Sequence, residues 1–365
     1  MLARDVLAVR DRLRANGDLA GNEPFAIGLR LSARAARELL GEAGGVARFR
    51  EWLEAHETYV FTINGFPYGD FHGTRVKERV FQPDWTTDER VAYTRDLFEI
   101  LAALVRPECG GSVSTLPGSH KSFGADDAMI RRNLLELSSF IDDLSEKSGI
   151  DLHLGLEPEP IGHFENTAET LAFFERLHGD AADRGRVARR IGLNYDCCHF
   201  ALQYEIAGEA LDALARAGIR LSKIHLSSAL AFDAHDAQAL ATVRQFEEPV
   251  YFHQSLVRRD GGEILRFIDL PDFLDAAESL PADASEARVH FHIPLDAEPQ
   301  APLRSTRDHA LETLAWCRAH PAACQHFEIE TYTWAALPAA MRRPVDEQIA
   351  AEFAWTLAQI RPAKP

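Results

Sequence analysis

Acidic and imidazole side chains end several short apolar segments of this chain. The stretch "LGLEPEP" (154–160) places Glu157 and Glu159 two residues apart behind an apolar run, and the proline after each glutamate disfavours a helix there. Polar residues of the same kind lie in or at the end of later apolar segments: Asp196, His225, His290, His292, Glu328 and Glu330. Such groups, buried together without partners, carry a large desolvation penalty, which a divalent metal ion among them would offset. The residue types therefore favour a metal site.

The elements that must position these residues are short strands alternating with helices. We identify eight strand-like segments: "FAIGLRLS", "YVFTING", "GSVSTLP", "LHLGLEP", "IGLNYD", "LSKIHLS", "RVHFHIP" and "HFEIETYTW". Helical patterns lie between them, several beginning at Thr, Ser or Asp and some closing at Gly. This alternation predicts an α/β fold, a (β/α)8 TIM barrel, in which functional side chains gather at the C-terminal ends of the strands.

The domain organisation follows from the same pattern. We expect one domain over residues 1–365, because no Gly/Ser linker or low-complexity tract divides the chain. The segment after "KIHLSS" is too long for a simple loop, and we expect an inserted hairpin near residues 247–270, with extended loops at the C-terminal face.

Composition narrows the function classes. The 365 residues carry a formal net charge of -17, which argues against binding nucleic acid or anionic membrane surfaces. No apolar run is long enough to cross a membrane, and no signal peptide is visible. Five cysteines without a CxxC pair favour free thiols in a reducing cytoplasm. We therefore expect a cytoplasmic protein with no nucleic-acid partner and no membrane insertion, and we leave a homo-oligomer open.

Four motifs in a fixed order resemble a known superfamily. The stretches "LEPEP", "NYDCCH", "KIHLS" and "EIETYTW", each on its own predicted strand, are similar to the xylose-isomerase-like TIM barrels. That group includes sugar isomerases, ketose 3-epimerases, inosose-metabolising enzymes and apurinic endonucleases of the endonuclease IV type. The resemblance implies that Glu157, Asp196, His225 and Glu330 hold a divalent metal, which we expect to be Mn, Mg, Co or Zn.

A narrower resemblance rests on longer stretches. The segments "GLRLS", "FTINGFPYGDFHGTRVKERVFQPDW", "STLPGSHK", "YFHQS", "VHFHIPL" and "EIETYTW" resemble the EboE proteins, xylose-isomerase-like members of the Ebo metabolite-traffic operon. That resemblance implies a role in the export or processing of a small metabolite.

Further residues are candidates for contacting a substrate. Glu159 is expected in the second shell or facing the substrate; related sugar isomerases have Lys at that position for the hydride shift, so Glu159 puts a hydride shift in doubt. His199 is a candidate for a second metal, a substrate hydroxyl or a helix cap. Of the two histidines in "VHFHIPL", we favour His292 for the site because it lies nearer the strand end. Endonuclease-IV-like relatives recruit zinc ligands from loops such as those that hold His72 and His120.

The long loop from residue 65 to residue 85 is aromatic and rich in turns. Its aromatic residues are candidates to cover one face of a sugar or cyclitol ring, or simply to pack over the barrel mouth: Phe66, Tyr68, Phe71 and Trp85. Lys77 and Arg75 are candidates to hold an anionic substituent.

The leading hypothesis is a divalent-metal isomerase or epimerase that acts on a small polyhydroxylated metabolite. The metal would polarise an oxygen of the substrate, while Glu157 and Glu330 exchange the proton on the adjacent carbon. Two alternatives stay open: a metabolite-binding or transport protein without turnover, and an endonuclease-IV-like zinc phosphodiesterase.

Overall fold

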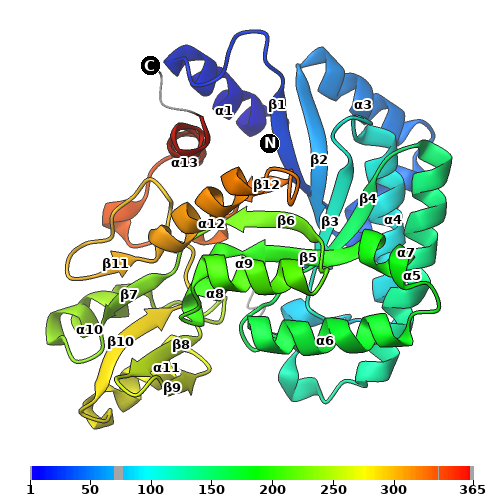
Figure 1. Cartoon of the computed structure of the whole chain (residues 1–365). Helices are drawn as coiled ribbons and strands as arrows, with labels where there is room; N and C mark the ends of the chain where they lie inside the picture. The colour runs from blue at the N-terminus through cyan, green and yellow to red at the C-terminus, as the bar shows by residue number, and fades with distance from the viewer. Residues whose placement is uncertain (1, 70–76, 336, 362–365) are drawn as a thin grey trace.

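Seven parallel strands form the central sheet. The structure, a computed structural model, describes residues 2–69, 77–335 and 337–361. The strands are ordered β1-β2-β3-β4-β5-β6-β12, and each neighbouring pair runs parallel (Figure 1). Their bounds are β1 Phe25–Arg30, β2 Thr58–Asn64, β3 Gly111–Thr115, β4 Leu152–Leu156, β5 Ile191–Asp196, β6 Leu221–Leu226 and β12 Phe327–Ile329. The predicted TIM-barrel fold is confirmed.

One predicted barrel strand belongs to a different sheet. We expected "RVHFHIP" (288–294) to be the seventh of eight parallel strands, and this is wrong, because β6 pairs directly with β12. Val289 instead ends β10, whose neighbours β7 and β8 both run antiparallel to it. This second sheet has the order β11-β7-β10-β8-β9. Its strands are β7 Leu230–Asp233, β8 Ser255–Arg259, β9 Ile264–Phe267, β10 Ala284–Val289 and β11 Arg304–Ser305.

The second sheet extends from the end of β6, at the C-terminal face of the barrel (Figure 1). Within it, β8 and β9 pair antiparallel over residues 255–267, inside the region for which the sequence predicts a hairpin. A separate apolar core that includes Phe232, Phe273 and Phe291 joins this sheet to α10 (Ala237–Val243) and α11 (Leu270–Ala276).

Helices connect successive strands of the barrel. The sequence predicts that several begin at Ser, Thr or Asp and some close at Gly, and both predictions are confirmed: Thr87 caps α4, Asp126 caps α5, and Gly149 ends α5 with φ 70°. The barrel helices are α2 Ala33–Gly41, α3 Gly45–Ala55, α4 Asp88–Leu104, α5 Asp127–Ser148, α6 Thr167–Asp180, α7 Arg184–Arg190, α8 Cys197–Leu202, α9 Ala207–Arg216 and α12 Arg307–Ala319.

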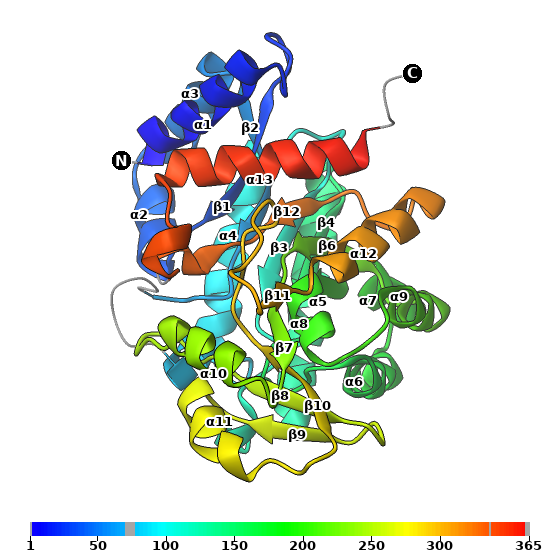
Figure 2. The same cartoon turned by 90° about the vertical axis from the view of Figure 1, so that its left-hand side faces the viewer.

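The two ends of the chain pack together. Helix α13 (Val345–Ile360) passes over β1 and lies against α1 (Leu2–Asn16), as Figure 2 shows. Val9, Leu13 and Phe25 form a small apolar cluster with Ala350, and the rings of Phe25 and Phe353 lie 5.2 Å apart. This packing covers the side of the sheet where its two edge strands lie.

Two observations concern the expected environment of the chain. Within the described residues, no helix is both long and apolar enough to span a membrane. All five cysteines are free thiols.

Candidate metal site and pocket

Four residues from four strands meet at the C-terminal end of the barrel. Glu157 follows β4, Asp196 ends β5, His225 lies on β6 and Glu330 follows β12. Each offers one ligand atom, and these atoms all lie within 4.8 Å of one another. The structure therefore brings together the four residues that the family resemblance names as metal ligands.

His225 stands at the centre of this group. Its Nδ1 atom lies 3.1 Å from Oε1 of Glu157, 3.1 Å from Oε2 of Glu330 and 3.4 Å from Oδ2 of Asp196. The side chains of Asp196 and His225 are fully buried, and that of Glu330 is 18% exposed. Three carboxylates thus converge on one imidazole in a place that water hardly reaches.

The local chain direction explains how Asp196 is aimed. Asp196 is the N-cap of α8, and its Oδ1 atom accepts hydrogen bonds from the backbone N–H of His199 at 3.1 Å and from the hydroxyl of Ser227 at 2.7 Å. The other oxygen, Oδ2, is buried and accepts no hydrogen bond from the part of the chain that the structure describes. A buried carboxylate oxygen that has no hydrogen-bond partner among the described residues and faces two further carboxylates is suited to bind a metal ion.

The pKa shifts report the same crowding. Burial raises the pKa of Glu330, and the nearby Glu157 carboxylate adds to the rise. Burial opposes protonation of His225, but Glu330 and Glu157 outweigh it and hold its pKa well above the usual value. A divalent cation would relieve the repulsion among the carboxylates, and a set of oxygen ligands with one imidazole suits Mn²⁺, Mg²⁺, Co²⁺ or Zn²⁺. The residues therefore fit the predicted metal.

A pocket opens above this group. Its volume is about 830 Å³ including its opening to solvent. The polar floor includes Glu157, Glu159, His199, His290 and Glu330. Apolar and aromatic side chains line the remaining wall: Phe66, Pro67, Val80, Phe81, Pro160, Ile161, Tyr251, Phe252 and Tyr332.

Glu159 and His199, both predicted to face a substrate, lie in this pocket. The Nδ1–H group of His199 donates to the carbonyl of Pro158 at 2.8 Å, which leaves Nε2 facing Oε2 of Glu159 at 3.4 Å. Burial raises the pKa of Glu159 to about 8, with a further rise from Glu157 and a counteracting effect of His199. Burial lowers the pKa of His199, but Asp196 and Glu159 outweigh it and raise that pKa to about 9.

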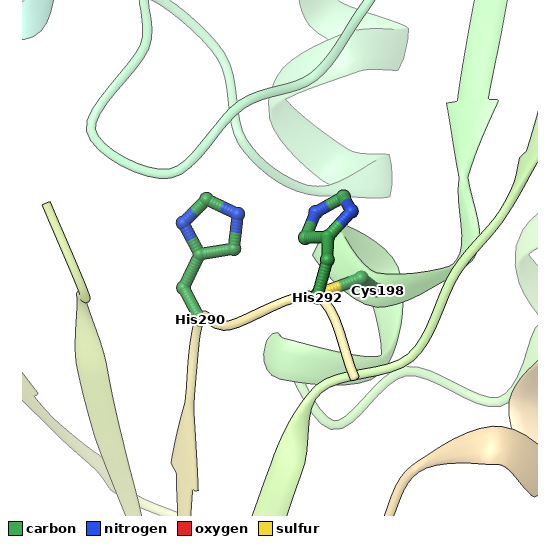
Figure 3. A group of neighbouring side chains, drawn as sticks. All are labelled: Cys198, His290 and His292. Atoms are coloured by element: carbon green, nitrogen blue, oxygen red, sulfur yellow. The ribbon is translucent and has the colours of Figure 1, made fainter. Parts of the chain in front are cut away.

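His290 and His292 both follow β10 and both lie near the four candidate ligands. Figure 3 shows both rings projecting to the same side of the chain, with Cys198 beside His292, and ligand atoms of the three lie within 4.8 Å of one another. His290 lines the pocket and its Nε2 lies 3.2 Å from Nε2 of His199. His292 is fully buried beside the four-residue group, with Nδ1 donating to the carbonyl of Glu330 at 2.8 Å.

The residues predicted from the aromatic loop lie in different parts of the structure. Phe66 and Lys77 line the pocket, but the Lys77 ammonium pairs with Asp269 at 2.5 Å. Tyr68 lines a different surface hollow, and its ring packs edge-on against Tyr93 at 5.1 Å. Other candidates lie elsewhere: Trp85 is buried in the barrel core, His120 caps a short turn of helix at 121–123, and Phe71, His72 and Arg75 fall outside the described residues.

Two charged residues lie beneath the four candidate ligands: Glu328, which the sequence places among the acidic groups near the site, and Lys223, which was not predicted to take part in it. Lys223, fully buried on β6, pairs with Glu328 on β12, and Glu328 lies 3.2 Å from Nε2 of His225. Burial raises the pKa of Glu328, but Lys223 and His225 outweigh it and bring that pKa down to about 2. Their spacing was the available signal, because each stands two residues before a predicted ligand, on the same face of its strand.

Comparisons with known proteins find only weak structural similarity. No family model matches the chain, and a search of curated proteins finds no match. Among solved structures, the IOLI protein with a binding zinc atom is similar at a TM-score of 0.45 and 11% identity, over 92% of this chain and 87% of that one. A D-psicose 3-epimerase in the presence of D-fructose has a TM-score of 0.44 and 12% identity, over 90% and 87%. An L-ribulose 3-epimerase has a TM-score of 0.42 and 12% identity, over 93% and 94%. Likenesses of this size assign neither a family nor an activity to the chain.

Proposed function

We propose that this protein is a divalent-metal-dependent isomerase or epimerase that moves a proton on a small polyhydroxylated metabolite. The observation that carries the proposal is that ligand atoms of Glu157, Asp196, His225 and Glu330 lie within 4.8 Å of one another. Two of these residues, Glu157 and Glu330, line the pocket. A metal held by these residues would polarise a carbonyl or hydroxyl oxygen of the substrate.

The side chains around the site divide the remaining tasks. Glu157 and Glu330 reach the site from β4 and β12, which lie apart in the sheet order, and we assign to them the removal and return of the proton on the carbon next to that oxygen. Glu159, whose pKa is raised by burial, lies in the pocket beside His199, and we assign to it a hydrogen bond with a substrate oxygen. The Nε2 atom of His199 faces the same space and binds a substrate hydroxyl.

The pocket walls support a small, ring-shaped substrate. Phe66, Phe81 and Phe252 offer apolar faces on which a sugar or cyclitol ring can pack, while the polar floor binds its hydroxyl groups. Lys77 pairs with Asp269, so we assign it a structural role in the pocket wall. We also assign to Lys77 any contact with an anionic substituent of the substrate.

We also propose that the chain is a cytoplasmic protein of the EboE type, acting in metabolite traffic. This rests on sequence stretches alone, chiefly "FTINGFPYGDFHGTRVKERVFQPDW" and "VHFHIPL". In cultures of cells that lack the protein, the concentration of a small metabolite in the medium should rise or fall. Untargeted mass spectrometry of cells and medium would detect this change. Unchanged metabolite profiles would refute this assignment.

The test of the proposed reaction separates metal binding from turnover. Protein stripped of metal is titrated calorimetrically with Mn²⁺, Mg²⁺, Co²⁺ and Zn²⁺. The reloaded protein is then incubated with sugars and cyclitols in deuterium oxide, and proton NMR follows the loss of carbon-bound protons.

We expect at least one compound to exchange a proton only with the metal-loaded protein, and the variants Glu157→Gln and Glu330→Gln to abolish the exchange. The chelator-treated wild type is the control for adventitious catalysis. Tight binding of a compound to the metal-loaded protein without any exchange would instead identify a metabolite-binding protein.

A further inference from the structure

A charged pair lies inside the barrel directly beneath the candidate metal site. Lys223 precedes His225 by two residues on β6, and Glu328 precedes Glu330 by two residues on β12. Side chains two apart on a strand share one face, so the pair forms the layer below the four candidate ligands. The Lys223 side chain is fully buried, and that of Glu328 is 17% exposed.

The pair is connected to the site through one imidazole. Oε2 of Glu328 accepts from Nε2–H of His225 at 3.2 Å and also pairs with the Lys223 ammonium. That ammonium donates a second hydrogen bond to Oγ of Ser114, on β3, at 3.1 Å. Glu328 therefore pairs with the buried Lys223 cation in its own layer and contacts the His225 ring in the layer above.

This contact decides which ring nitrogen faces the site. An imidazole that binds a metal ion through Nδ1 keeps its one N–H on Nε2, and there the Glu328 carboxylate is placed to accept it. Nδ1 is the atom that faces Glu157, Asp196 and Glu330. The amide nitrogen of Asn194 lies 3.2 Å from Nδ1 and 3.4 Å from Nε2, so its contact barely distinguishes the two nitrogens.

We propose that Glu328, held in place by Lys223, is a positioning residue that fixes the orientation of the His225 ring so that Nδ1 is presented to the metal. The inference rests on the proposed function for the role of His225 as a ligand. A carboxylate behind a ligating histidine typically changes metal affinity by roughly 10–100-fold when it is removed.

The decisive variants replace charge while keeping size. Glu328→Gln is nearly isosteric, and the double variant Lys223→Met with Glu328→Gln removes both charges and leaves neither unpaired. Arg190→Met is the control, because it breaks ion pairs with Asp142 at 2.7 Å and Asp151 at 2.9 Å, near the opposite ends of the strands. Circular dichroism and thermal melting establish that each variant is folded.

Two readouts test the proposal. Competition with a chromophoric chelator measures Zn²⁺ affinity, and we expect a loss of roughly 10–100-fold in both Glu328 variants, with no loss in the Arg190 control. Nuclear Overhauser contacts of the imidazole ring protons in metal-free protein report the orientation of the His225 ring; we expect one fixed orientation in the wild type and more than one in the variants.

Unchanged Zn²⁺ affinity together with an unchanged His225 ring orientation in folded Glu328→Gln would overturn the proposal and leave the pair as barrel packing. If the double variant does not fold, the single variant decides. If wild-type protein binds none of the divalent metals, the proposed function fails, and the ring-orientation measurement alone then decides whether Glu328 positions the ring.

Discussion

Gly28 on β1 leaves the space that the carboxylate of Glu328 on β12 occupies. A Cβ atom at position 28 would overlap Oε1 of Glu328 and stand 2.6 Å from its Cδ. β1 and β12 are the two edge strands of the parallel sheet, so this contact joins the edges through a side chain. The carboxylate cannot retreat freely, because Lys223 and His225 hold its other oxygen.

We therefore expect Gly28→Ala to displace Glu328 from His225. The variant should lose about 1–3 kcal/mol of unfolding free energy, the usual effect of overpacking, and it should bind Zn²⁺ more weakly. Chemical denaturation and chelator competition measure the two effects. Gly41→Ala is the control, since a Cβ there meets nothing within 4 Å. Equal stability and Zn²⁺ affinity in the two variants would contradict the close contact.

The barrel could be predicted from the sequence because its strands recur at regular intervals and its helices carry ordinary caps. The error at residues 288–294 has a physical reason: an apolar segment with alternating side chains suits either sheet, and its partners cannot be read from one sequence. Here β7 and β8, which both follow β6 in the chain, pair with β10. Beyond Val289 the chain leaves the sheet, and Ile293 N–H donates to the carbonyl of Ser228.

The candidate site was partly predictable for a similar reason. Strand ends bring Glu157 and Glu330 together whatever the loops do, whereas the position of Tyr68 depends on how one loop packs against Tyr93. The preference for His292 over His290 assumed a straight barrel strand that the chain does not form. Lys223 was overlooked because a buried lysine has no sequence signature apart from its spacing to His225.

The acidic charge leads to a prediction about nucleic acid. With a formal net charge of -17, the protein should neither bind nor cleave a DNA duplex with an abasic site at physiological salt. A gel-shift titration and a cleavage assay, each repeated with Zn²⁺-loaded protein, check this. Cleavage that disappears in Asp196→Asn would show instead that the site serves a phosphodiesterase.

Substitution of the candidate ligands Glu157 and Glu330 should weaken metal binding more than substitution of the neighbouring Glu159. Glu157→Gln and Glu330→Gln each remove a carboxylate that lies 3.1 Å from Nδ1 of His225, so divalent-metal affinity should fall by roughly 10–100-fold or more. Glu159→Gln should keep most of the bound metal, because Glu159 faces His199 in the pocket. Elemental analysis of folded, purified protein measures this, and full occupancy in both former variants would refute the metal site.

The C-terminal helix supplies a prediction that does not involve metal. Glu352 on α13 is buried and accepts hydrogen bonds from the N–H of Leu295 at 3.0 Å and the hydroxyl of Thr331 at 2.6 Å. Burial raises its pKa from 4.5 to about 7, against the opposing effect of those hydrogen bonds. Because the folded state then binds the proton more tightly than the unfolded state, Glu352 makes stability fall as pH rises from 4.5 to about 7.

Glu352→Gln should remove this loss, since glutamine stays neutral and keeps an acceptor oxygen for Leu295 and Thr331. Relative to the wild type, its unfolding free energy should increase with pH across that window by up to roughly 3 kcal/mol. Urea unfolding at several pH values measures the difference. Glu312→Gln, an exposed change on α12, is the control and should show no such gain, because its side chain stays in water in both states. A constant difference between Glu352→Gln and wild type at every pH would mean that Glu352 ionises alike in the folded and unfolded protein.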